Sequence, residues 1–257
     1  MLHFLLDYYY LSTQQGKVHS SMINPKSFDQ YAEKYDLWFL ENPNLLRSEV
    51  KLVAKTLEGC HNIFSVGCGS GLFEAILRQE YGITIENGLE PSQDMASIAM
   101  KRGLNITITT AENYDYAGKR YDTIIYNGCP GYITNLEQAL TQSFHALNPG
   151  GKIIVIDIPK ESGYGLLYNL AKAVQSWDHP LLKEVYPRHP YPIELVEQAN
   201  WRTTQEKIDT MKKIGFEDFE FLQTLTTHPI YSDDIIEEPI EGFDKGDYVA
   251  ICAYKRA

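Results

Sequence analysis

From Phe28 onward, two patterns of apolar residues alternate along the chain, one typical of strands and one typical of helices. Short apolar runs such as NIFSV (62–66) and KIIVIDI (152–158) predict buried strands. Longer stretches such as 45–57 and 135–147 place apolar residues three and four apart, which predicts amphipathic helices. Helices that alternate with strands are typical of a parallel sheet covered on both faces. The pattern therefore predicts an α/β fold with right-handed crossovers.

Seven segments carry the strand pattern. In chain order they are 62–66, 83–90, 106–110, 121–128, 152–158, 216–226 and 247–255. No internal repeat or low-complexity segment interrupts them. A length of 257 residues suits one elaborated α/β domain. We expect that domain over 28–257, preceded by an N-terminal extension, 1–27.

The pattern becomes irregular between residues 159 and 200. This segment holds five prolines and aromatic residues that include Tyr164, Trp177 and Tyr191. A long irregular stretch inside a compact domain is usually either functional or disordered, and this aromatic content argues against disorder. We expect a lid or binding insertion, followed by a helix that Thr203 caps.

Charge excludes two classes of partner. The chain carries 23 Lys and Arg against 34 Asp and Glu, a formal net charge of −11, and no stretch gathers basic residues. Nucleic acid and anionic membrane surfaces are therefore poor partners. Four scattered cysteines, Cys60, Cys68, Cys129 and Cys252, form no C-x-x-C pair. They predict reduced thiols in a cytoplasmic protein and no metal site.

The first residues, MLHFLLDYYYL, are apolar but about half as long as a membrane-spanning helix requires. They carry no basic n-region and no small-residue cleavage site, so we expect no targeting signal. Three interpretations stay open for this segment: a docking helix, a homodimer contact, and an upstream extension ahead of Met22.

The turn SVGCGSG (65–71) is the first candidate binding motif. Its glycines allow close approach of a ligand and direct helix N-terminal N–H groups toward it. The dinucleotide fingerprint needs a glycine where this chain has Leu72, and no Lys-Ser/Thr pair follows as in a P-loop. Glu90 ends the next strand, where an acidic side chain can accept hydrogen bonds from a ribose diol.

Five segments, taken in their order along the chain, indicate which kind of ligand the turn binds. They are VGCGSG, LEPSQDM, TAENYDY, YDTIIYNG and LNPGGKIIVIDI. Together they resemble the class I S-adenosylmethionine-dependent methyltransferases, in particular the small-molecule branch of methyltransferase type 11. The resemblance implies a Rossmann-like, doubly wound, seven-stranded and mostly parallel sheet with a late antiparallel strand. It also implies S-adenosylmethionine as the cofactor.

The resemblance further implies which residues bind that cofactor. Gly67, Cys68 and Gly69 would lie against its methionine part, Glu90 would hold the ribose, Pro91, Ser92, Met95, Ala111 and Glu112 would line the adenine, and Asn127 and Gly128 would lie beside the sulfonium. The helix FDQYAEKYDLWF resembles the family's first helix, and it makes Tyr31, Tyr35 and Trp38 candidates to cover the cofactor. The family typically has an acidic residue where this chain has Ser65, so one polar contact to the methionine end is missing or replaced.

Methyl transfer is an in-line displacement that depends on proximity, orientation and a dry pocket. Asn127, beside the sulfonium, and His189 and Tyr191, in the insertion, are the candidate catalytic residues. His179 is a further acid-base candidate, because histidine titrates near neutral pH. The Tyr and Trp content of the insertion and the absence of basic clusters predict a small, partly apolar or aromatic acceptor.

Three alternatives remain at this stage. A cofactor-binding protein of the same fold without transfer activity is favoured by Ser65. A nicotinamide-dependent oxidoreductase is opposed by Leu72, which stands where the dinucleotide fingerprint needs its third glycine. A scaffolding module would use the aromatic N-terminus to bind a partner.

Overall fold

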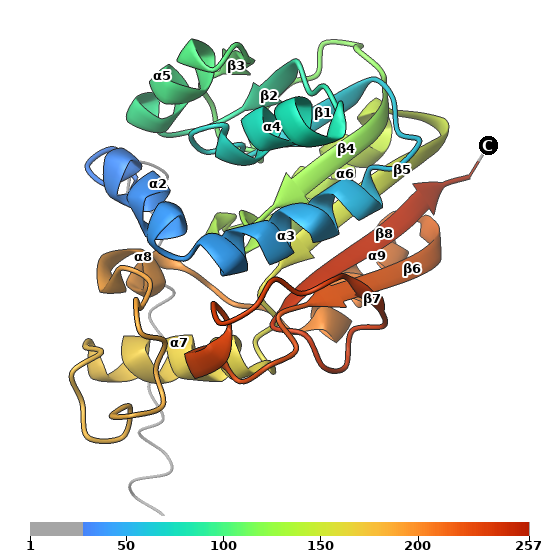
Figure 1. Cartoon of the computed structure of the whole chain (residues 1–257). Coiled ribbons are helices and arrows are strands. Elements are labelled where there is room, and N and C mark those ends of the chain that lie inside the picture. The colour runs from blue at the N-terminus through green and yellow to red at the C-terminus, as the bar shows by residue number, and fades with distance from the viewer. Residues whose placement is uncertain (1–27, 257) are drawn as a thin grey trace, which may run out of the picture.

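The structure is a computed structural model that describes residues 28–256. It is built around one eight-stranded sheet (Figure 1). The strand order is β3-β2-β1-β4-β5-β8-β6-β7. The strands are β1 Ile63–Val66, β2 Asn87–Leu89, β3 Asn105–Thr107, β4 Tyr121–Asn127, β5 Leu147–Asp157, β6 Phe216–Thr224, β7 Ile240–Glu241 and β8 Tyr248–Lys255.

Strands β1 to β5 pair in parallel, and β8 pairs antiparallel with both β5 and β6. This arrangement confirms the predicted mostly parallel sheet with late antiparallel strands. The structure adds an eighth strand, β7, to the predicted seven. That strand spans only Ile240–Glu241, which is too short to produce a visible alternation in the sequence.

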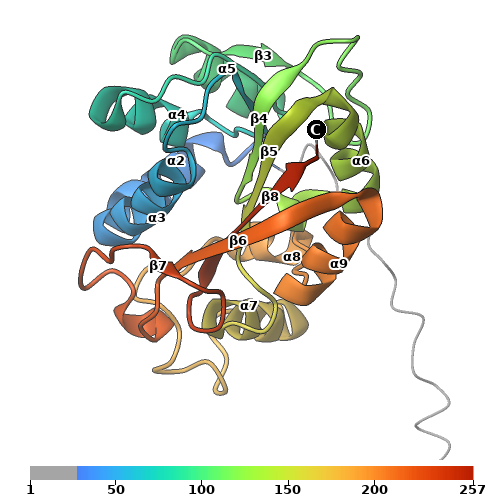
Figure 2. The same ribbon diagram turned by 90° about the vertical axis from the view of Figure 1, so that its right-hand side faces the viewer.

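Helices cover both faces of the sheet, with α3 and α4 on one face and α6 and α9 on the other (Figure 2). The helices are α2 Ala32–Glu41, α3 Pro43–Thr56, α4 Leu72–Ile76, α5 Gln93–Lys101, α6 Leu136–Ala146, α7 Gly163–Val174, α8 Ile193–Gln198 and α9 Thr204–Ile214. Within residues 28–256, no helix combines the length and the apolar character that crossing a membrane requires.

Alternating side chains of the central strands divide between two apolar cores. On β5, Ile154 and Ile156 pack into the core under α3, whereas Ile153 and Val155 pack into the core under α6 and α9. A strand buried on both faces reads as a continuous apolar run, because successive side chains point to opposite faces.

Local capping signals fix several helix ends. Thr203 and Glu206 form a reciprocal capping box at the start of α9, and Gly215 ends that helix in the left-handed conformation. Ser92 accepts the N–H of Met95 at the start of α5, as Asn135 accepts that of Gln138 at the start of α6.

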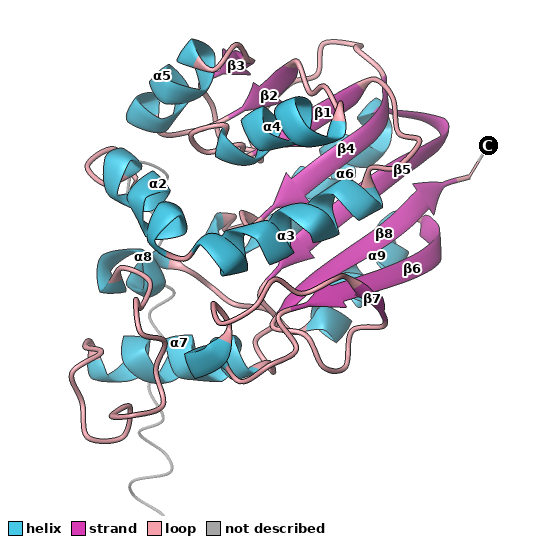
Figure 3. Cartoon of the chain, in the orientation of Figure 1, coloured by secondary structure: helices cyan, strands magenta, loops and turns pink. Residues whose placement is uncertain are grey.

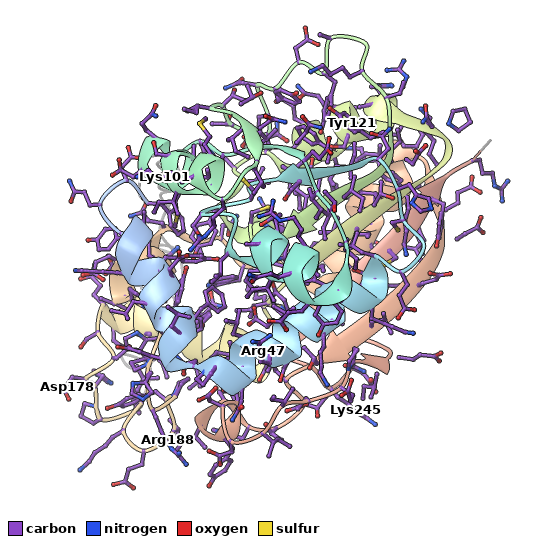
Figure 4. All side chains as sticks on the ribbon, turned by 45° about the horizontal axis from the view of Figure 1, so that its top comes forward. Arg47, Lys101, Tyr121, Asp178, Arg188 and Lys245 are labelled. Atoms are coloured by element: carbon purple, nitrogen blue, oxygen red, sulfur yellow. The ribbon has the colours of Figure 1, made fainter. Side chains whose placement is uncertain are left out.

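The segment 159–200 is more regular than its sequence predicts. It contains α7 and α8, joined by a long loop (Figure 3). Two glycines in the first turn of α7, Gly163 and Gly165, hide the helical pattern because glycine is a weak helix former. Asp178 and Arg188 lie on the joining loop, at the outer edge of the molecule (Figure 4). The aromatic N-terminal segment, with its proposed partner contacts, lies outside the described residues.

Candidate functional site

A large cavity of about 360 Å³ lies at the carboxyl ends of β1, β2 and β4. Its walls combine the turn after β1, the residues after β2, the loop 110–113, the loop after β4, and the aromatic side chains of Phe28 and of Tyr35 on α2. Lining residues named by the sequence are Gly67, Gly69, Glu90, Pro91, Met95, Ala111, Glu112, Gly128 and Tyr191. Motifs far apart in the chain therefore meet at one place.

The glycine turn is held close to neighbouring backbone. Gly67 has φ +63°, and its N–H donates to the carbonyl of Leu89 over 2.9 Å. A Cβ at Gly67 would lie 2.7 Å from Cβ of Cys129, so a larger residue does not fit. The turn needs glycine for its backbone conformation and for its space.

Glu90 closes the turn from the other side. Its carboxylate accepts the N–H of Gly69 and the N–H of Ser92, each over 2.9 Å. The side chain is buried, and burial raises its pKa to about 7 against those two hydrogen bonds. A carboxylate has about four acceptor positions, so Glu90 retains capacity for two hydroxyl groups of a ligand in the large cavity.

Aromatic residues cover the large cavity from α2 and the segment before it. Phe28 and Tyr35 line it, and their rings meet edge to face at 5.9 Å. Tyr31 does not line it; its ring instead lies 5.4 Å from Nζ of Lys34. Arg102 anchors α2 by donating to Asp36 over 2.6 Å.

A second cavity, which we call the aromatic cavity, adjoins the first and measures about 50 Å³. More than half of its lining residues are aromatic. They come from α2, α4, α7, β8 and the segments around residues 132, 191 and 201. They include Trp38, Tyr168, Tyr191, Trp201 and Tyr248. The predicted insertion thus supplies one wall of the aromatic cavity.

The two cavities share a wall made of Tyr35, Gly128, Tyr132 and Tyr191. The Tyr132 hydroxyl in this wall is buried and has no hydrogen-bond partner in the described part of the chain. The indole N–H of Trp201, which lines the aromatic cavity, is buried without a partner in the same region. Buried polar groups normally find partners, so these two atoms are candidates to contact a ligand.

Asn127 lies at the end of β4 and lines the aromatic cavity rather than the large one. The hydroxyl of Tyr248 donates to its amide oxygen over 2.9 Å. That bond fixes the amide from a residue 121 positions away in the sequence.

Ser65 has an acidic neighbour that the sequence did not reveal. Its hydroxyl donates to Oε1 of Glu74 over 2.7 Å, and Oε2 of that carboxyl is buried with no partner among residues 28–256. Glu74, Gly67, Cys68 and Asn127 line a small recess beside the turn. A carboxylate from α4 therefore lies where the strand lacks one.

Neither cavity is lined by a lysine, arginine or histidine of the described residues. Glu90 and Glu112 line the large cavity, and Glu49 and Asp157 line the aromatic one. The site as a whole is therefore suited to ligands with positive charge.

Comparison with known proteins decides the family. The family described as "Methyltransferase domain" matches residues 38–217, well over half of the chain. The chain belongs to this family.

Two relatives share most of the length of this methyltransferase. A crystal structure from Thermotoga maritima, described as an S-adenosylmethionine-dependent methyltransferase and possible histamine N-methyltransferase, is 29% identical with a TM-score of 0.76. The match covers 91% of this chain and all of that one. An uncharacterised protein of Methanocaldococcus jannaschii is 27% identical over 228 residues, covering 89% of this chain and 98% of its own.

The plantazolicin methyltransferase BpumL in complex with S-adenosylhomocysteine shares the fold, with a TM-score of 0.58 at 14% identity over 91% of this chain and 95% of its own. The findings together confirm the predicted enzyme class, the class I fold and S-adenosylmethionine as the cofactor. A protein without transfer activity and a nicotinamide-dependent oxidoreductase are not favoured.

Several predicted site residues lie elsewhere in the methyltransferase. His189 is exposed and lines neither cavity, although its carbonyl accepts the indole N–H of Trp38 over 2.9 Å. Ser92 is buried as the cap of α5 and donates to Asp29 over 2.7 Å. Cys68, by contrast, stays beside the glycine turn, in the recess that Gly67 and Glu74 also line. His179 caps its own turn by accepting the N–H of Leu181.

Sequence reasoning missed residues whose role depends on packing. Glu49 and Glu74 sit inside helices, where a single polar position in an amphipathic pattern gives no sign of burial. Tyr132 and Trp201 carry no motif, and a tyrosine or tryptophan in a loop is by itself ordinary. None of the four could have been found from local spacing.

Proposed function

We propose that this methyltransferase transfers a methyl group to a small, partly apolar or aromatic molecule that binds in the aromatic cavity. One observation carries the proposal: the aromatic cavity and the large cavity share a wall at the carboxyl ends of the parallel strands. In open α/β sheets, ligands bind at that edge. Two adjoining sites suit a donor and an acceptor that have to meet.

The residues of the large cavity fit S-adenosylmethionine. Glu90 would accept the ribose hydroxyls, Ala111 and Glu112 would line the adenine, and the glycine turn would lie against the methionine part. When bound, this cofactor supplies a methyl group already activated by a positively charged sulfur. The chain then has to orient the acceptor and exclude water.

We propose that Glu74 takes the role of the acidic residue that the family typically has at the position of Ser65. Its carboxyl faces the recess shared by Gly67 and Asn127, with one oxygen held by Ser65 and the other unpaired within the described residues. An ammonium group, such as the one on the methionine part of the cofactor, would satisfy that oxygen. Loss of the strand acid therefore does not imply loss of cofactor binding.

Asn127 and Tyr191 remain our candidates for contact with the reacting groups. Asn127 is fixed by Tyr248, and Tyr191 lines both cavities. Burial keeps the pKa of Tyr191 well above its usual value, so its hydroxyl is neutral and orients rather than accepts protons. We do not assign an acid-base role to His189, because its side chain faces solvent.

We also propose how the domain is organised, where the enzyme acts and which partners it binds. Residues 159–200 act as a lid, because their aromatic side chains close the aromatic cavity. The methyltransferase domain spans 28–257, behind an extension at 1–27 that can mediate a homodimer. The scattered cysteines support a cytoplasmic enzyme. The net charge of −11 supports an enzyme that binds neither nucleic acid nor anionic membrane surfaces. A small acceptor also agrees with histamine, named for the T. maritima relative.

Calorimetry and a product assay test the proposed function. S-adenosylmethionine and S-adenosylhomocysteine should bind with micromolar affinity, whereas NAD should not bind. A panel of small aromatic amines, phenols and thiols should then yield S-adenosylhomocysteine with at least one acceptor class. Tyr168→Ala should raise KM for that acceptor, and Tyr231→Ala, a change at a tyrosine that is 53% exposed, should not. Unaltered KM in Tyr168→Ala would remove the aromatic cavity from the acceptor site.

A further inference from the structure

We propose that the aromatic cavity recognises a small organic cation, an amine in its ammonium form, and that Glu49 supplies the negative charge that binds it. This inference rests on the proposed function, since it names the chemical class of the acceptor. It is based on the position of one carboxyl group, on the aromatic rings around it and on the absence of a counter-ion among residues 28–256.

Glu49 lies in the middle of α3, on the face that packs toward the sheet. Its side chain is only 5% exposed, and it lines the aromatic cavity. No hydrogen bond joins its carboxyl group to any residue of the described part of the chain. A carboxyl buried without a partner is costly, and burial raises the pKa of Glu49 to about 8.

The other carboxyl of the aromatic cavity already has a counter-ion. Asp157, at the end of β5, lies 3.5 Å from Nζ of Lys207, and both side chains are 1% exposed. Glu49 has no such partner among residues 28–256, and the cavity lining contains no basic residue. Among residues 28–256 no charge remains to pair with Glu49, and a ligand can bring one.

The aromatic rings favour the same ligand. The negative face of an aromatic ring attracts a cation within about 6 Å of the ring centre, and tryptophan does so best. Trp38, Tyr168, Tyr191 and Trp201 surround the space that Glu49 faces. A ring of aromatic groups with one carboxylate is how proteins bind alkylammonium groups. A neutral or anionic acceptor would leave Glu49 unpaired.

The size of the aromatic cavity limits the group it holds. A cavity needs about 10–15 Å³ by this measure to hold one water molecule, and the aromatic cavity offers about 50 Å³. The ammonium end of an acceptor, a group of a few heavy atoms, fits this space. The nitrogen would face the shared wall of Tyr35 and Tyr132, since the methyl donor binds on the other side of that wall.

Glu49 also accepts a proton from the ammonium group during methyl transfer. An ammonium nitrogen must lose one N–H proton before it has a lone pair, and the Glu49 carboxylate accepts that proton. The freed lone pair forms the C–N bond as the methyl carbon leaves sulfur, and the C–S electron pair stays on sulfur. Glu49 then passes its proton to water. The pKa near 8 suits a proton acceptor at neutral pH.

The groups that face Glu49 do not compete for this proton. Apart from Asp157, which pairs with Lys207, the titratable groups lining the aromatic cavity are tyrosines. They are Tyr35, Tyr132, Tyr164, Tyr168, Tyr191 and Tyr248. Burial raises the pKa of each of them, so all are neutral at pH 7. Burial also raises the pKa of Asp157, and it raises that of Glu90 in the adjoining large cavity to about 7. The part of the proton release that Glu49→Gln abolishes is therefore the part that reports Glu49.

Calorimetry with matched probes tests the inference on the full chain saturated with S-adenosylhomocysteine. Trimethylammonium is compared with tert-butanol, and benzylammonium with benzyl alcohol, at pH 7 in buffers of different ionisation enthalpy. We expect at least one cation to bind about 10- to 100-fold more tightly than its neutral isostere, as for a charged hydrogen bond. Its binding should release close to one proton, because the cation drives Glu49 to ionise, whereas the isostere should release none.

Glu49→Gln should remove both the preference for cations and the proton release, while leaving the affinity for S-adenosylhomocysteine unchanged. Glu41→Gln is the matched control, because Glu41 is an exposed carboxylate at the end of α2. Equal binding of cation and isostere would overturn the inference but keep an acceptor site. If none of the four probes bound, both the inference and the proposed acceptor site would fall. If Glu49→Gln did not fold, the wild-type comparison and its proton release would still decide.

Discussion

At the scale of the residue, three buried glutamates lie in the site, and each is accommodated differently. Glu90 accepts two backbone N–H groups, Glu74 accepts the hydroxyl of Ser65, and Glu49 has no partner in the described residues. Burial raises the pKa of all three. Hydrogen bonds from the protein thus hold the carboxyl groups of Glu90 and Glu74, whereas none holds that of Glu49 within the described residues.

Glu90 should contribute directly to cofactor affinity. Glu90→Ala removes an acceptor for the ribose hydroxyls and releases the N–H of Gly69. Calorimetry should show the affinity for S-adenosylhomocysteine weakened by about 2–3 kcal/mol, as for hydrogen bonds to a charged group. Glu86→Ala, an exposed position before β2, is the control and should bind as the wild type does. Equal affinity in Glu90→Ala would remove Glu90 from the binding site.

Glu49 should make the stability of the protein depend on pH in a definite direction. Its pKa is about 8 in the folded state against an ordinary 4.5, so between these values the folded chain holds a proton that the unfolded chain releases. Its contribution to the free energy of unfolding is therefore greatest near pH 4.5 and falls as pH rises to about 8.

The loss over that range is on the order of 5 kcal/mol at 1.36 kcal/mol per pH unit. Urea unfolding at pH 5, 6, 7 and 8 should show stability falling more steeply with pH in the wild type than in Glu49→Gln. Glu90, whose pKa is raised to about 7, contributes in the same direction in both proteins. Parallel curves for the two proteins would show that Glu49 does not titrate in this range.

At the scale of the element, the turn between β1 and α4 carries the most exact geometry. Gly67, Gly69 and Gly71 all have positive φ, and the turn is clamped by Leu89 on one side and Glu90 on the other. Short strands and a tight turn bring the N-terminus of α4 to the large cavity. A change of one atom in this turn therefore acts on the ligand site.

Two glycines allow the effect of space to be separated from that of backbone conformation. Gly59 and Gly67 both have positive φ, but a Cβ at Gly59 meets nothing within 4 Å, whereas one at Gly67 lies 2.7 Å from Cβ of Cys129. Gly59→Ala should cost about 1 kcal/mol of stability from the left-handed backbone alone. Gly67→Ala should cost at least about 1 kcal/mol more and should weaken cofactor binding. Equal losses in urea unfolding would show that Cys129 moves away freely.

At the scale of the whole molecule, both cavities form where the carboxyl ends of the strands meet helices from distant parts of the chain. In Figure 1, α2, α7 and α8 lie at this end of the sheet. The cavities therefore exist only in the folded state, and ligands that bind there must stabilise it.

S-adenosylhomocysteine at one hundred times its dissociation constant should add about 2.7 kcal/mol of stability. For a domain of this size, that should raise Tm by roughly 5–10 °C. NAD at the same concentration should leave Tm unchanged, and thermal unfolding followed by circular dichroism measures both. An equal shift with NAD would show that the large cavity does not discriminate between these cofactors.

The amino-acid sequence by itself determined the order of the elements, the glycine turn and the strand-end position of Glu90. Each depends on residues that are close together in the chain. The signals are an apolar period of 2 or 3.6 residues, a capping residue, or a glycine at a position whose backbone conformation requires one. The segment 159–200 shows the limit of such signals, since its glycines and prolines concealed α7 and α8.

Only the tertiary structure decided what surrounds the reacting groups. It gathered Tyr35 from α2, Glu49 from α3, Tyr168 from α7 and Tyr248 from β8 around one cavity, and it turned His189 toward solvent. The burial and hydrogen bonding of a side chain depend on residues over a hundred positions away, as the bond from Tyr248 to Asn127 shows. The sequence pattern shows the period of a helix, but whether a buried carboxyl group has a counter-ion is decided only when the chain folds.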